Sequence, residues 1–164
     1  MSDFNLAMPC VLQHEGGFVD NARDPGGATH FGISLRFLQQ INPDATVHDI
    51  DLLSEADAIN IYQQLWWNRY HYAAIDAQCI ATKVLDLAIN MGCYQAHLCL
   101  QRAIRAATGV NVVEDGILGE ESLRAINAAN PIALLAAFKS EAAGFYRSLR
   151  QTQFEKGWLS RAYD

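Results

Sequence analysis

Two carboxylic acids and a hydroxyl group lie close together near the start of the chain, in a stretch rich in glycine. Glu15 precedes a pair of glycines, Asp24 follows nine residues later, and Thr29 follows after five more. Two carboxyl groups held in different protonation states can cleave a glycosidic bond, because one protonates the leaving oxygen while the other stabilises the cation or activates water. The Thr29 hydroxyl is suited to positioning that water.

The residues before this stretch predict a helix that gives the two carboxyl groups different pKa values. Apolar residues recur at helical spacing from Phe4 through Met8 and Val11, so an amphipathic helix is expected that ends at a glycine pair. Glu15 falls on the apolar stripe of the last turn, where unpaired carbonyls carry partial negative charge. Both effects raise the pKa of a carboxyl group, whereas Asp24 lies among polar residues and is expected to be ionised.

Each fragment also has a purely structural interpretation. Glu15 alone fits a solvated residue at a helix end, and the segment from Asp24 to Gly27 alone fits a turn. The combination of the two is harder to explain as structure only. Gly27 and the neighbouring glycines let the backbone turn and leave room for a bulky sugar.

An aromatic run follows further along the chain. Sugar rings stack on such side chains, although core packing accounts equally well for most of them. Trp66 continues the predicted buried stripe of Tyr62, so Trp67 and Tyr70 are the residues expected to line a saccharide cleft.

Three other polar groups have two interpretations each. His30 either binds substrate or packs as a turn residue, and Asn90 either donates to a sugar or caps a loop. Cys10 and His14 are four residues apart, but a helix C-terminus disfavours a thiolate. A buried thiol beside a helix-end histidine is therefore expected.

Composition narrows the classes of function. The 18 acidic and 12 basic residues give a net charge of −6, which repels nucleic acid. The four cysteines include no CxxC pair, so neither a zinc site nor any other metal site is predicted. The start of the chain lacks the features of a signal peptide, and no apolar run approaches the length of a membrane span.

The remaining elements are predicted to be mainly helical, so the fold class is mostly α. A long loop or short hairpin is expected over residues 18–33, because its glycines and prolines follow no regular period. Helices are expected over residues 35–40, 80–91, 98–107, around 123–126, and from Pro131 to 149. Ser54 and Asp57 resemble a capping box that opens a further helix running through Ile59, Tyr62 and Trp66.

The segment "HEGGFVDNARDPGGATHFGIS" resembles the signature of glycoside hydrolase family 108, the lysozyme-like N-acetylmuramidases. The matching positions are Glu15–Phe18, Asp24–Gly27, Thr29 and Gly32–Ile33, with Phe18 where the family often has tyrosine. The segments "YQQLWWNRYHYAAI" and "VLDLAINMGCYQAHLCLQRAI" are similar to later family motifs. The segments "DGILGEESLRAIN" and "KGWLSRA" look like the peptidoglycan-binding region that usually follows.

The resemblance implies a lysozyme-like helical fold that hydrolyses the β-1,4 bond of peptidoglycan without a cofactor, with Glu15 as the catalytic acid. It implies a catalytic region over residues 1–91 and a helical peptidoglycan-binding region over residues 92–164, packed into one body. Asp24 and Thr29 match the trio of phage-type lysozymes, except that the threonine comes one residue earlier here. The alternatives are a non-catalytic module that binds the wall or assists secretion, and a lytic transglycosylase.

The expected partner is the peptidoglycan glycan strand, with no nucleic acid and no stable membrane insertion. A protein made in the cytoplasm without a signal peptide needs another route to the periplasm or cell wall. The resemblance suggests a holin or an export pore.

Overall fold

The computed structural model describes residues 1–12 and 28–164. The elements are α1 (Phe4–Leu12), β1 (Thr29–His30), β2 (Ile33–Ser34), α2 (Leu35–Ile41), α3 (Val47–Asp51), α4 (Glu55–Tyr62), the π-helical turn η1 (Gln63–Asn68), the 3₁₀ turn η2 (Tyr72–Ala74), α5 (Gln78–Met91), α6 (Cys93–Thr108), α7 (Glu120–Ala128), α8 (Pro131–Ser148) and α9 (Thr152–Tyr163). The prediction of a mostly α chain is confirmed.

Local capping accounts for where several helices begin. Ser34 Oγ accepts a hydrogen bond of 3.1 Å from the Phe37 amide at the start of α2. Ser54 and Asp57 form the predicted capping box of α4, in which each side chain accepts from the other residue's amide. Asn130 caps α8, and Pro131 occupies the first turn, where its missing N–H costs nothing.

The predicted hairpin lies at the end of the glycine-rich stretch. Thr29 pairs with Ser34 and His30 with Ile33 in an antiparallel register. The two turn residues, Phe31 and Gly32, have φ values of 49° and 76°, as the tight hairpin turn that matches strand twist requires. Tyr62 Oη donates to the Phe31 carbonyl at 2.7 Å, so the hairpin is attached to α4 at its strained residue.

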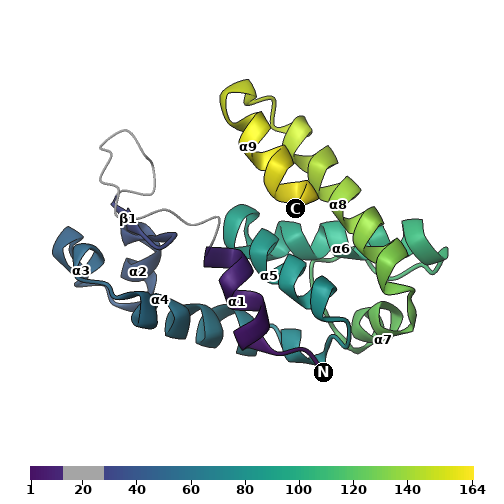
Figure 1. Ribbon diagram of the computed structural model, residues 1–164, viewed down its shortest axis with the longest axis horizontal. Helices are drawn as coiled ribbons and strands as arrows, with labels where there is room; N and C mark the ends of the chain where they lie inside the picture. Colours follow the sequence, from purple (N-terminus) through teal and green to yellow (C-terminus); the bar gives the residue numbers. More distant parts are fainter. Residues whose placement is uncertain (13–27) are drawn as a thin grey trace.

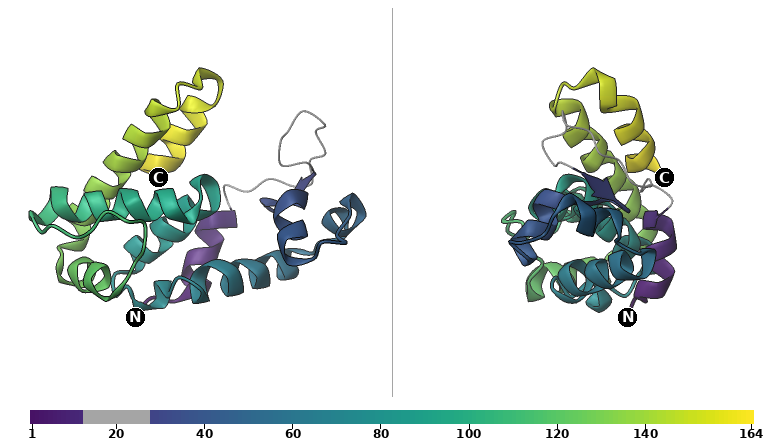
Figure 2. Two further views of the ribbon diagram at one scale, coloured as in Figure 1. Left: turned by 180° about the vertical axis from the view of Figure 1, so that it is seen from behind. Right: turned by 90° about the vertical axis from the view of Figure 1, so that its left-hand side faces the viewer.

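The helices form two groups joined by one long helical run (Figure 1). The hairpin lies with α2 and α3 at one end of the molecule, whereas α1 and α5–α8 form the larger group at the other. The run from α4 through η1 connects them, and α8 and α9 extend side by side from the larger group (Figure 2).

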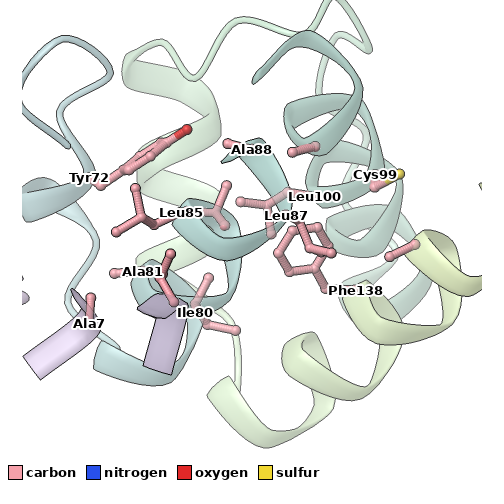
Figure 3. Packing of buried hydrophobic residues seen from close by; sticks show 14 of the residues in the cluster. Ala7, Tyr72, Ile80, Ala81, Leu85, Leu87, Ala88, Cys99, Leu100 and Phe138 are labelled. Atoms are coloured by element: carbon pink, nitrogen blue, oxygen red, sulfur yellow. The ribbon is translucent and has the colours of Figure 1, made fainter. Parts of the chain in front are cut away.

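The core lies around α5, α6 and α8. Leu85, Leu87, Leu100 and Phe138 are fully buried and meet there (Figure 3). The same cluster of buried side chains continues to Phe4 in α1 and to Ala162 in α9, so residues on both sides of Gly92 share it. The division of the chain at residue 92 stays a prediction.

None of the helices in the described ranges combines the length and the apolar character needed to cross a bilayer.

Candidate functional site

A groove lies where the two groups of helices face each other. It encloses about 340 Å³ and takes its walls from α2 on one side, the start of α6 on the other, and η1 with the residues just after it. We call it the α2–α6 groove, and its lining residues are Phe37, Gln40, Ile41, Leu65, Trp66, Arg69, Tyr70 and Cys93.

The π-helical turn η1 decides which tryptophan enters this groove. Trp66 is partly exposed, and its ring centroid lies 4.7 Å from that of Phe37 and 5.3 Å from that of Tyr62. Trp67 is 3% exposed and packs edge-on against Phe4 in α1. The expectation that Trp66 would be the more buried of the two is wrong, and a substrate contact by Trp67 stays a prediction.

One polar atom at the groove has an unusual environment. Trp66 Nε1 is buried, and no group within residues 1–12 and 28–164 accepts a hydrogen bond from it. A buried donor without a partner is uncommon, because it forfeits the hydrogen bond it made to water in the unfolded chain.

A hydrogen-bonded network lies in the core beside the groove. His97 Nδ1 lies 2.8 Å from the Gly116 carbonyl and must donate to it, which leaves Nε2 to accept. Tyr72 Oη therefore donates to Nε2 over 2.7 Å. The Cys93 thiol, which lines the groove, lies close to both Tyr70 and Tyr72.

Burial keeps the side chains of this hydrogen-bonded network uncharged. It lowers the pKa of His97 and raises the pKa of the Cys93 thiol. The pKa of Tyr72, which is fully buried, lies well above its ordinary value for the same reason. An uncharged network holds its donor directions near neutral pH.

The predicted site residues of the hairpin are attached to α3. His30 Nδ1 lies 3.1 Å from the Ile50 carbonyl, and its ring stacks on Phe31 with centroids 4.1 Å apart. Thr29 is partly buried in β1.

The other predicted site residues lie on different elements. Tyr70 lies in the α2–α6 groove, whereas Asn90 is near the end of α5 and accepts a 2.6 Å hydrogen bond from Tyr146. Glu15, Asp24 and Gly27 lie outside the described residues, so the structure does not test whether Glu15, Asp24 and Thr29 come together. All site assignments made from the sequence stay predictions.

A larger cavity of about 520 Å³ lies between α1, α5 and α8, but its charged groups already have partners. Lys83 Nζ donates to the Arg161 carbonyl at 2.6 Å and contacts Asp86 at 3.4 Å. Lys139 donates to the backbone carbonyls of Tyr163 and Asp164. This cavity is a junction between helices, so the α2–α6 groove is the better candidate site.

In the part of the chain that the structure describes, no group of His, Cys, Asp and Glu side chains is arranged to hold a metal ion. The polar groups of the groove are instead neutral hydrogen-bonding groups and one guanidinium, that of Arg69. These groups suit an uncharged polar ligand such as a sugar.

The sequence does not identify Trp66, Arg69 and Cys93 as groove residues. Its pattern places Trp66 on a helical core stripe and gives Arg69 and Cys93 no role in a site. The sequence signal for Trp66 and Arg69 is that they lie close to Tyr70 in the chain. That they line one groove together with Cys93 depends on how η1 and α6 pack.

Comparisons with known proteins agree with this architecture. The family Glycosyl hydrolase 108 matches residues 8–92, and the family Predicted Peptidoglycan domain matches residues 95–163. The chain is similar to the solved structure of Brucella abortus SagA, with 30% identity, a TM-score of 0.83, and coverage of 98% of this chain and 89% of that one. No curated protein matches it.

The two family matches support a peptidoglycan-related, lysozyme-like function, and the predicted lysozyme-like helical fold is confirmed. The first match takes in just over half of the chain, including the whole stretch from Glu15 to Thr29. With that match and a similar solved structure along nearly its entire length, this chain belongs to the glycosyl hydrolase 108 family.

Proposed function

We propose that the chain is an N-acetylmuramidase that hydrolyses the β-1,4 glycosidic bond of peptidoglycan, with Glu15 as the general acid. The observation that carries this proposal is the family match over residues 8–92, which contains Glu15, Asp24 and Thr29. The second match, over residues 95–163, supports binding to peptidoglycan by the rest of the chain.

The chemistry needs one protonated and one ionised carboxyl group. Phe4, Met8 and Val11 of α1 are buried, and Glu15 follows Val11 in the sequence at the same helical spacing, which favours the protonated form. Asp24 follows among polar residues and is the group expected to stabilise the cation or activate water. Thr29, in β1, is expected to orient that water.

The direct test replaces Glu15 by glutamine, which keeps the size of the side chain and removes the acidic proton. Wall clearing is measured on purified sacculi beside wild type and beside Glu120→Gln, a matched change at an exposed position in α7. We expect Glu15→Gln to lose activity by about 10²- to 10⁴-fold and Glu120→Gln to keep it. Circular dichroism checks that both proteins are folded.

Wild-type activity in a folded Glu15→Gln protein would refute the proposal. The products separate the remaining possibilities, because hydrolysis releases reducing ends, whereas a lytic transglycosylase releases an anhydro sugar seen by mass spectrometry. Binding to sacculi without any released product would identify a non-catalytic wall-binding module. The route to the wall, a holin or an export pore, stays a prediction.

A further inference from the structure

The connection between α8 and α9 carries a charge opposite to that of the rest of the molecule. Residues 145–158, which we call the α8–α9 corner, contain three basic residues and one acidic residue, whereas the rest of the chain contains nine basic and 17 acidic residues. The corner lies at the far end of the two helices, away from α7 (Figure 1 and Figure 2). A positive projection on a negative body orients the molecule in the field of a charged partner.

The cations of the corner are available to such a partner. They are Arg147, Arg150 and Lys156, and all three are exposed. None of them forms an ion pair with another described residue. By contrast, Arg105 of α6 is also exposed but contacts Glu114. Unpaired cations on one corner repel one another, and an anionic partner offsets that repulsion.

Apolar side chains are exposed on the same corner. Phe154 is 51% exposed and Leu149 is 38% exposed. The Phe154 ring packs on Trp158 with centroids 5.5 Å apart, and Trp158 stacks on the buried Tyr146 at the same distance. Exposure therefore increases along this row of rings from Tyr146 to Phe154, and the outer ring is supported from the core.

Basic and apolar side chains that are exposed together match the boundary between lipid headgroups and acyl chains. Lys and Arg are attracted to anionic headgroups, while Phe, Trp and Leu side chains leave water for the acyl boundary. A soluble polyphosphate would pair with the cations but would leave Phe154 and Leu149 in water. The charge of the corner is thus complementary to an anionic surface, and its apolar side chains favour a bilayer as that surface.

We propose that the α8–α9 corner docks on a bilayer that contains anionic phospholipids, with its three cations at the headgroup phosphates and with Phe154 and Leu149 at the acyl boundary. Because the rest of the chain is acidic and is repelled by the same surface, the corner is the part that faces the lipid. This inference goes beyond the proposed hydrolysis of peptidoglycan and does not depend on it.

The test measures co-sedimentation of the full chain with lipid vesicles. Vesicles of phosphatidylethanolamine and phosphatidylglycerol should bind the protein, whereas vesicles of phosphatidylcholine alone should not. Raising the salt concentration from about 0.05 M to about 0.5 M should release it, because salt screens the charges. Combining Arg147→Gln with Lys156→Gln should weaken binding by about ten- to thirtyfold. Phe154→Ala should weaken binding by about three- to tenfold.

Matched controls separate the corner from net charge and from general hydrophobicity. Arg36→Gln combined with Arg124→Gln removes two exposed cations outside the corner. Ile132→Ala shortens an apolar side chain that is 79% exposed near the other end of α8. Both control proteins should bind as wild type does. Circular dichroism checks that all of the variants are folded.

Tryptophan fluorescence identifies the face that meets the lipid. Trp158 lies in the corner and is partly exposed, so lipids brominated near the headgroup should quench its emission. Trp158→Phe should remove most of that quenching, whereas Trp66→Phe, in the α2–α6 groove, should preserve it. No quenching in wild type, or quenching that survives in Trp158→Phe, would refute docking through the corner.

Equal binding to both kinds of vesicle, or binding to neither, would overturn the inference. So would equal weakening by the two double variants, because net charge alone would then explain it. If inorganic polyphosphate binds with the same dependence on Arg147 and Lys156, and Phe154→Ala leaves vesicle binding unchanged, the corner recognises phosphate polymers and not a bilayer. Since the readout is lipid binding, a wild type that fails to clear walls would refute only the muramidase proposal.

Discussion

Trp66 and Trp67 are adjacent in the chain, yet one lines the α2–α6 groove and the other lies in the core. In a regular α-helix the residue four positions after Tyr62 would share its buried face. In a π-helical turn such as Gln63–Asn68, each backbone hydrogen bond joins residues about five apart instead of four. The residue that shares the buried face of Tyr62 is therefore the fifth one after it, Trp67. One inserted residue in the turn therefore moves an indole from the core to the groove.

The pH dependence of activity belongs to the residue scale, because a single proton on Glu15 is required. We expect the rate to fall as pH rises through the pKa of Glu15, by about tenfold for each further unit, since the fraction of protonated acid falls in that way. The measurement is the initial rate of sacculus clearing at saturating substrate across neutral pH. A rate that stays constant on the alkaline side would contradict general-acid catalysis by this residue.

His97 provides a second prediction at this scale. Burial lowers its pKa in the folded protein below the unfolded value of about 6.5. As pH falls below that unfolded value, the unfolded chain binds a proton that folded His97 resists, so the free energy of unfolding decreases towards acid. The contribution is fully present above about pH 6.5 and is lost as pH falls towards the folded-state pKa.

Urea unfolding between about pH 8 and pH 5 measures this dependence. The variant His97→Gln cannot titrate there and is expected to have a flatter profile, while Tyr72 and Gly116 lose their preferred partner and stability falls at every pH. His48→Gln, at an exposed position in α3, is the control and should keep the wild-type slope. Equal slopes in wild type and His97→Gln would show that the profile arises elsewhere.

At the scale of elements, a buried charge cluster joins α5 to α9. Asp86 is 3% exposed, and its carboxylate accepts from Arg161 Nε at 2.9 Å and contacts Lys83 Nζ at 3.4 Å. Burial lowers the pKa of Lys83, and the nearby Asp86 opposes that shift. The cluster holds α9 against α5, because Arg161 of α9 contacts Asp86 of α5 and its carbonyl accepts from Lys83.

Removing the carboxylate should therefore be costly. Asp86→Asn removes the buried carboxylate that both Lys83 and Arg161 contact, and we expect the free energy of unfolding to fall by about 3–5 kcal/mol. Chemical denaturation measures it, beside Asp76→Asn, whose ion pair with the N-terminus is exposed and should contribute little. A loss as small as that of the control would mean that water reaches the cluster.

At the scale of the whole molecule, one core runs through both family-matched regions. Phe138 of α8 is fully buried against residues of α5 and α6, and the cluster reaches from Phe4 to Ala162 (Figure 3). Regions that share a core lose its contacts together, so their unfolding is coupled.

We accordingly expect a single cooperative unfolding transition by calorimetry, with equal calorimetric and van't Hoff enthalpies. Phe138→Ala should move the whole transition and cost about 3–5 kcal/mol, whereas Phe154→Ala, at a side chain that is 51% exposed, should cost much less. Two resolved transitions, of which Phe138→Ala moves only one, would instead indicate two independent domains.

The sequence by itself determined the features that depend on neighbours in the chain. The capping box at Ser54 and the start of α8 at Pro131 follow from hydrogen bonds over three or four residues. The end of α5 at Gly92 follows from the freedom of glycine, whose φ there is 88°. The Glu15 motif and the family it indicates are likewise readable without a fold.

Only the tertiary structure decided the features that depend on contacts between distant segments. The groove combines Phe37 of α2 with Cys93 of α6, and α9 is stabilised by Trp158, which stacks on Tyr146 at 5.5 Å. The helix α9 and the hydrogen bonds of His97 with Tyr72 and Gly116 were not predicted for the same reason. Capping and propensity act over a few residues, whereas burial and side-chain hydrogen bonding depend on which surfaces meet after the chain has folded.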